Sequence, residues 1–194
     1  MSKADPSAQK KERNKTIRWV ITIFFVTIFV SGMISMISDQ IMASSTTAVA
    51  FLILLAIVLL GILFDIIGVA VTSADEKPFH SMAARKVPGA QEAIRLLRNA
   101  ERVSSICNDV VGDICGVVSG SASATIAASI LANFEFTWPR VVTLLMSAFA
   151  AGLTVGGKAI GKGFAVSSST EIVHGVGKLL HVLRCFRKSS GKKK

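Results

Sequence analysis

The sequence predicts an all-α, polytopic helical membrane protein with about four transmembrane helices and additional interfacial (belt) helices on the cytoplasmic side. Three observations predict this fold class: two long apolar runs, two segments of similar length rich in small residues, and basic residues gathered near the ends of these four segments or outside them. Of the 194 residues, 51% are hydrophobic. The mean hydropathy of +0.58 is high for a soluble domain.

The first two spans are long apolar stretches at residues 17–37 and 48–64. Each approaches or exceeds the roughly 17–25 residues that cross a hydrocarbon core. The first run follows the basic leader KKERNKTIR, an order that is also found in signal peptides. It is long for a signal peptide, however, and no clear A-x-A cleavage site follows it, so we expect an uncleaved first span.

Two further spans are predicted at residues 103–132 and 141–161, which are rich in glycine, alanine and serine. Small side chains let helix backbones approach closely inside a membrane. The third span carries small residues at intervals of four, and this ridge predicts a close helix–helix contact along several turns. Its members are Gly112, Gly116, Gly120, Ala124 and Ala128.

The basic residues predict the orientation of the chain. Six lie in residues 1–18, six in the linker 73–102 and nine from Lys158 onward, whereas Arg140 is alone between the last two spans. The positive-inside rule then places both termini and the linker in the cytoplasm, as in a bacterial-type plasma membrane. Attraction to anionic lipid headgroups, about 1 kcal/mol per basic residue, accounts for this charge without a nucleic-acid partner.

The predicted organisation has four parts. A basic tail, 1–16, precedes a transmembrane domain, 17–165, which contains the cytoplasmic linker 73–102. A juxtamembrane belt helix, 166–185, and a basic tail, 186–194, follow. Within the linker we expect two short helices, 79–87 and 90–101, separated by a turn at Pro88-Gly89.

Acidic residues inside the predicted spans are the main candidates for function. Ser105, Asp109 and Asp113 follow one another at intervals of four, so they share one helix face, and Asn108 lies beside it. An ionised aspartate at the centre of a bilayer costs about 2.5–3.5 kcal/mol. We therefore expect a cation beside these carboxylates, or access of water to them.

Two cations fit this requirement, and the residues alone leave both open. A hard divalent ion such as magnesium takes carboxylate, hydroxyl and amide oxygens as ligands. Alternatively, Lys158, Lys162 or Arg102 forms an ion pair with the two aspartates. The cysteines and histidines have no spacing that suggests zinc or copper, and His80 beside Ser81 is no nucleophile–base pair, so no enzyme is predicted.

Three short motifs resemble the transmembrane domain of the CorB/CorC and cyclin M (CNNM) magnesium transporters. Residues 72–82, TSADEKPFHSM, resemble that family's FSASETALFSL motif. Residues 99–116, NAERVSSICNDVVGDICG, resemble its NPxRLLSTLLIGNNLVN motif, although the Gly-Asn-Asn part needs a shift. Residues 157–162, GKAIGK, lie where the family carries GExxPK. The matching positions are Ser73, Ala74, Glu76, Ser81, Asn99, Arg102, Ser105, Gly157 and Lys162.

The resemblance implies a homodimer of three core spans and a belt, with a magnesium site between the helices. Lys158 replaces the family's glutamate in the third motif. Either its ammonium takes the place of the ion, or Asp109 and Asp113 supply the missing negative charge. The expected metal ligands are Ser73, Ser105, Asn108, Asp109 and Asp113. Glu76, Asp65 and Lys158 would lie at the cytoplasmic mouth or behind the ligands.

Two functions are therefore expected as alternatives. The first is a CorB/CorC-like protein that binds and transports magnesium or a similar divalent cation, by efflux or exchange. The second is a non-transporting membrane scaffold or regulatory subunit, in which Lys158 neutralises the intramembrane aspartate pair. The family's paired CBS regulatory modules have no counterpart in this sequence.

Overall fold

The computed structural model describes residues 6–43, 45–134 and 137–190, and in these ranges the chain is helical with no strand. This confirms the predicted all-α class. The elements, in chain order, are α1 (Pro6–Ala43), α2 (Thr47–Ser73), α3 (Lys77–Ala84), α4 (Ala90–Leu97), α5 (Ala100–Ser105), a π-helical segment η1 (Ile106–Val111), α6 (Gly112–Asn133), α7 (Pro139–Ser167) and α8 (Ser169–Ser190).

Within the described residues, four helical segments are long and apolar enough to cross a membrane, as the sequence predicts. They are Ile17–Met42 in α1, Thr47–Ser73 in α2, Ala100–Asn133 across α5, η1 and α6, and Pro139–Ser167 in α7. The helices extend beyond the apolar runs. α1 begins at Pro6, within the predicted tail, because the polar residues that follow are mostly good helix formers.

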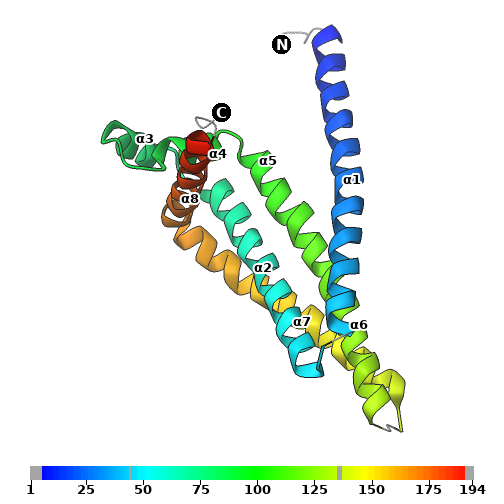
Figure 1. Ribbon diagram of the computed structural model, residues 1–194. Coiled ribbons are helices and arrows are strands. Elements are labelled where there is room, and N and C mark those ends of the chain that lie inside the picture. Colours follow the sequence, from blue (N-terminus) through cyan, green and yellow to red (C-terminus); the bar gives the residue numbers. More distant parts are fainter. Residues whose placement is uncertain (1–5, 44, 135–136, 191–194) are drawn as a thin grey trace.

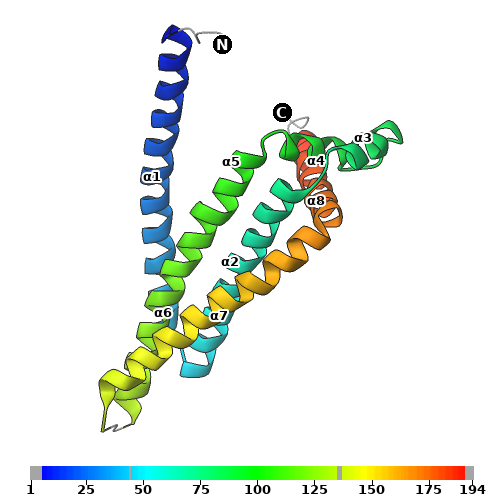
Figure 2. The same ribbon diagram turned by 180° about the vertical axis from the view of Figure 1, so that it is seen from behind.

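α2 lies between α6 and α7, whereas α1 stands to one side (Figures 1 and 2). The spans differ in how much of their most apolar stretch of 18 residues is buried. No residue of this stretch is buried in α1, whereas 28% are buried in α2 and 44% in the third span. The buried residues of α1, Ser38 and Met42, lie near its C-terminal end, where it approaches α6. The first span is therefore apolar mainly because it faces lipid.

Glycines let the helices around α2 approach closely. A Cβ atom on Gly61 would lie 2.9 Å from the Cβ of Cys115 in α6. A Cβ on Gly161 of α7 would lie 2.8 Å from Cγ1 of Ile66. Small residues thus form the central helix contacts. Most of them are not members of the small-residue ridge predicted in the third span.

The predicted ridge of the third span is wrong for most of its length within this chain. Gly112 is buried against the neighbouring helices, but Gly120, Ala124 and Ala128 are exposed. Nothing lies within 4 Å of a Cβ built on Gly116 or Gly120. The spacing correctly groups these residues on one side of the helix, but most of that side points away from α2.

The helices α3, α4 and α8 form a cap at the end of the molecule where both chain termini lie (Figure 1). Phe79, Ala93 and Val173 are fully buried in the cap, together with Ala70 and Val71 from the end of α2. The expected turn at Pro88-Gly89 is present, and Gly89 has a left-handed backbone with φ 86°. A Cβ on Gly177 of α8 would lie 2.5 Å from the Gly89 carbonyl oxygen, so α4 and α8 touch directly.

Candidate functional site

A polar cluster is buried where α2, η1, α6 and α7 meet. Asp65 lies in α2, the span of highest mean hydropathy, and is only 4% exposed. Nζ of Lys158, from α7, lies 3.9 Å from Oδ1 of Asp65. A Cβ on Gly112 would lie 3.2 Å from the same Nζ, so the missing side chain at residue 112 leaves room for the lysine.

The side-chain amide of Asn108 packs against α2 at Gly68, where a Cβ would overlap Oδ1 of Asn108. Nδ2 of Asn108 donates a hydrogen bond of 3.3 Å to Oγ of Ser104. Asp65 and Gly68 are three residues apart and so lie on one face of α2. Asp65 and the Asn108 amide therefore lie on the same side of that helix.

Two oxygen atoms in this cluster are buried without a hydrogen-bond partner. They are Oδ2 of Asp65 and Oδ1 of Asn108. In the described part of the chain, no other buried side-chain nitrogen or oxygen lacks a hydrogen-bond partner. A buried acceptor left unpaired costs about 1–3 kcal/mol, so most such atoms in folded proteins have a partner. The pair therefore indicates a place for a cation or for ordered water.

The η1 segment sets the orientation of the third span at this point. The backbone N–H of Gly112 bonds to the carbonyl oxygen of Cys107, five residues earlier, as in a π-helix. Such turns are rare and are frequent at functional sites. With this geometry Cys107, Gly112 and Cys115 are buried, whereas Asp109 remains exposed.

The predicted ligand set is divided between two faces of the third span. Oγ of Ser105 donates a hydrogen bond of 2.8 Å to Oδ2 of Asp109, which fits the shared face expected from the spacing. Asp109 and Asp113 are exposed, however, whereas Asn108 faces α2. These residues therefore do not form one ligand cluster within the chain.

The expectation that Lys158 faces the aspartate pair is also not met. Lys158 lies against Asp65, and no ion pair joins it to Asp109 or Asp113 in the described ranges. The reason is the close contact of α7 with α2, where Gly157 and Gly161 pack against Ile62 and Ile66. This contact brings the intervening lysine to the α2 face that carries Asp65.

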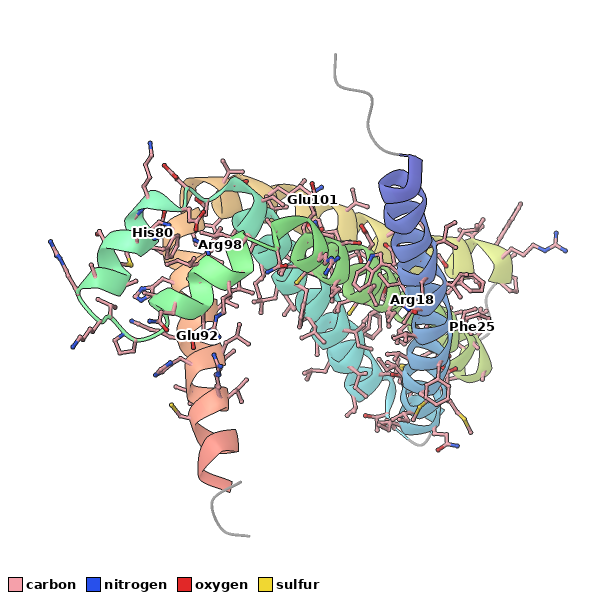
Figure 3. All side chains as sticks on the ribbon, turned by 90° about the horizontal axis from the view of Figure 1, so that it is seen from above. Arg18, Phe25, His80, Glu92, Arg98 and Glu101 are labelled. Carbon is pink, nitrogen blue, oxygen red and sulfur yellow. The ribbon has the colours of Figure 1, made fainter. Side chains whose placement is uncertain are left out.

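The two expected site residues at the end of α2 lie outside the cluster. Ser73 is exposed in the last turn of α2, about 12 Å along the helix axis from Asp65. Glu76 accepts hydrogen bonds from Nε of Arg98 at 3.0 Å and lies 3.1 Å from Nε2 of His80. The Arg98 hydrogen bond lowers the pKa of Glu76 below its ordinary value. Glu76 therefore joins the parts of the cap, where Figure 3 labels His80 and Arg98.

The cluster offers oxygen ligands for a hard cation. In the part of the chain that the structure describes, no group of three or more His, Cys, Asp or Glu side chains could hold a metal ion. The cluster instead combines the Asp65 carboxylate, the Asn108 amide oxygen and the Ser104 hydroxyl, a donor set of the kind that magnesium and calcium use. The Lys158 ammonium lies beside the carboxylate, in the position of a competing cation.

Sequence reasoning placed Asp65 behind the ligands and paired Lys158 with Asp109 and Asp113. It named Gly112 only as part of the small-residue ridge, and it did not identify Ser104 or Gly68. One signal for Asp65 was available, because this carboxylate stands near the end of a long apolar run. No signal in the sequence showed that Gly68 would pack against Asn108. A search of protein-family models and of curated proteins gives no match to this chain, so the CorB/CorC resemblance rests on its three motifs alone.

Proposed function

We propose that the chain is a membrane transport protein that binds a hard divalent cation, magnesium in the first place, between α2, η1 and α7. The observation that carries this proposal is the pair of buried, unpartnered oxygens of Asp65 and Asn108 beside Lys158. Ionisable residues inside a membrane domain are rare and mark ion or substrate pathways.

Lys158 acts as a tethered cation that balances Asp65 until an ion arrives. Its 3.9 Å separation from Oδ1 is longer than the 2.7–2.9 Å or so of a charge-assisted hydrogen bond. A divalent ion at Asp65 would repel the ammonium, so binding requires Lys158 to move away. The ion would then gain both Asp65 oxygens and Oδ1 of Asn108, and would keep several water ligands.

The site lies nearer to the cap than to the opposite end of α2. Asp65 is about 12 Å along the axis from Ser73 and about 27 Å from Thr47. Under the positive-inside rule the cap and both termini face the cytoplasm of a bacterial-type plasma membrane. An ion would enter from that side and leave after a rearrangement of α7 against α2, by efflux or exchange.

Magnesium binding to the purified protein in detergent, followed by calorimetry, tests the proposal. We expect saturable binding that is lost in Asp65→Asn and kept in the matched control Asp113→Asn, since Asp113 is exposed on the far face of the third span. Loss in Asp113→Asn alone would instead place the site on that outer face. Variants that differ in binding would next be compared for magnesium flux in liposomes.

A second pair of variants tests the role of Lys158. We expect Lys158→Met to bind magnesium more tightly than the wild type, because the competing ammonium is gone. Lys162→Met is the matched control, because Lys162 is exposed one turn further along α7. Weaker binding in Lys158→Met would show that the lysine supports the site rather than competing with the ion.

The alternative function, a scaffold or regulatory subunit, is favoured by the exposed face of the third span. Asp109, Asp113, Gly120 and Ala124 are exposed there, although carboxylates facing lipid cost about 2.5–3.5 kcal/mol each at the bilayer centre. A second copy of the chain would cover these residues in a homodimer. Cross-linking in liposomes tests this, with Ala124→Trp expected to separate the copies. A folded dimer that binds no magnesium would favour the scaffold over the transporter.

A further inference from the structure

A cavity of about 540 Å³ lies between α4, the start of α5 and α8. Part of its lining is apolar and the other part is polar or charged. The apolar residues are Leu96, Val103, Leu180 and Leu183, and the polar residues are Glu92, Arg95, Asn99 and Arg184.

The packing of the cap explains where this cavity forms. α4 and α8 touch at Gly89 and Gly177, and beyond this contact Glu92 bridges the two helices. Oε2 of Glu92 lies 3.5 Å from Nδ1 of His181, and Oε1 lies 3.6 Å from Nη1 of Arg184. Figure 3 shows Glu92 on the side of α4 that faces α8. The cavity continues from this bridge toward Asn99 and Val103.

The cavity lies at the boundary between the cap and the membrane-spanning segments. Val103 belongs to the first turn of the third span, which begins at Ala100, and Asn99 directly precedes it. Leu180 and Leu183 on α8 are exposed, at 38% and 57%. The cavity therefore adjoins the first turn of a candidate membrane span, and its lining combines apolar and polar residues.

The charges of the cavity favour an anion. Arg95 forms no ion pair within the described residues, and its side chain is exposed. Arg184 shares the single carboxylate, Glu92, with His181. The lining thus contains two arginines and one carboxylate, which leaves a net positive charge. Arginine is well suited to bind a phosphate through two parallel hydrogen bonds.

We propose that this cavity is a binding site for an anionic phospholipid. The phosphate lies between Arg95 and Arg184, and part of one acyl chain lies along the four apolar residues. A soluble phosphate would leave those apolar residues uncovered. A zwitterionic lipid would place the positive group of its own headgroup near the two arginines. This site is independent of the proposed cation site, because it shares no residue with the Asp65 cluster.

Native mass spectrometry of the full chain, released from detergent with added lipid, tests the proposal. The probes are phosphatidylglycerol and phosphatidylcholine with identical acyl chains. We expect phosphatidylglycerol to bind more tightly, and Arg95→Gln to weaken it about fivefold, as expected for the loss of about 1 kcal/mol per basic residue. The matched control is Arg98→Gln, which removes the same charge from an arginine that is bound to Glu76 and lies outside the cavity.

Three results would overturn the site. Equal weakening in Arg95→Gln and Arg98→Gln would show diffuse attraction to a basic surface. Equal affinity for the two lipids would show that the charge of the headgroup is not recognised. Competition by glycerol phosphate, which has no acyl chains, at the same concentration as phosphatidylglycerol would indicate a soluble anion. Leu183→Gln is a second variant, expected to weaken lipid binding and leave the circular dichroism spectrum unchanged.

Discussion

Carboxylates in two neighbouring spans have opposite surroundings. Asp65 of α2 is buried beside Lys158, whereas Asp109 and Asp113 of the third span are exposed. The sequence pattern drew attention to Asp109 and Asp113, because two acidic residues one helical turn apart are unusual in a membrane span. The structure assigns the buried charge to the isolated aspartate instead. The number of charges in a span therefore says little about which one the helices enclose.

Removal of the buried carboxylate should have the largest effect on stability. Asp65→Ala leaves Lys158 without its partner, and breaking a buried pair in this way costs about 3–5 kcal/mol. Asp113→Ala should not lower the unfolding free energy, because no ion pair joins this exposed carboxylate to another described residue. Unfolding by sodium dodecyl sulfate in mixed micelles measures both.

The double variant Asp65→Ala/Lys158→Met sharpens this test. Without the lysine no unpaired charge remains, so most of the lost stability should return. Similar losses in Asp65→Ala and Asp113→Ala would show that the two surroundings are equivalent, contrary to the structure.

A smaller effect is expected where α2 meets η1. Gly68→Ala would place a methyl group on Oδ1 of Asn108, and overpacking of this kind costs about 1–3 kcal/mol. Gly32→Ala in α1 is the matched control, since nothing lies within 4 Å of a Cβ there. That control should stabilise its helix by about 0.5–1 kcal/mol. Equal changes of unfolding free energy in Gly68→Ala and Gly32→Ala, measured by the same assay, would contradict the close packing of Asn108 on Gly68.

The smallest effect concerns the pH dependence of the cap. The hydrogen bond from Arg98 lowers the pKa of Glu76 from 4.5, so the ionised form is favoured by folding. Its contribution is complete above pH 4.5 and is lost as the pH falls through the lowered pKa. Limited proteolysis of the linker at neutral and acidic pH should show this loosening. Glu76→Gln should reduce the difference, and the exposed Glu101→Gln should not.

Most of the fold follows from hydropathy and small-residue content. The four spans, the turn at Pro88-Gly89 and the helical linker all agree with the sequence, because apolar length and turn chemistry are local properties. The position of α1 does not follow, since a span that faces lipid and one that faces protein can be equally apolar. Its hydropathy of 2.4 lies between those of α2 and the third span, although it is the least buried in the structure.

The candidate site was harder to predict than the fold. Spacing correctly placed Ser105 and Asp109 on one face, as their hydrogen bond shows. Spacing cannot say whether that face points toward other helices or away from them. The decisive contacts, Asn108 on Gly68 and Lys158 beside Asp65, depend on how α2 meets η1 and α7. These are tertiary features with no local signature.

The π-helical segment η1 also bears on how this chain is aligned with others. A π turn holds one residue more than an α turn, which is the usual outcome of a single inserted residue inside a helix. Deleting one residue between Ile106 and Val111 would convert this π turn into an α turn and leave the helix faces on both sides of it in register. The comparison with the CorB/CorC motif needs a shift in this same stretch. An alignment that allows a one-residue gap within 106–111 would therefore keep equivalent helix faces together on both sides of it.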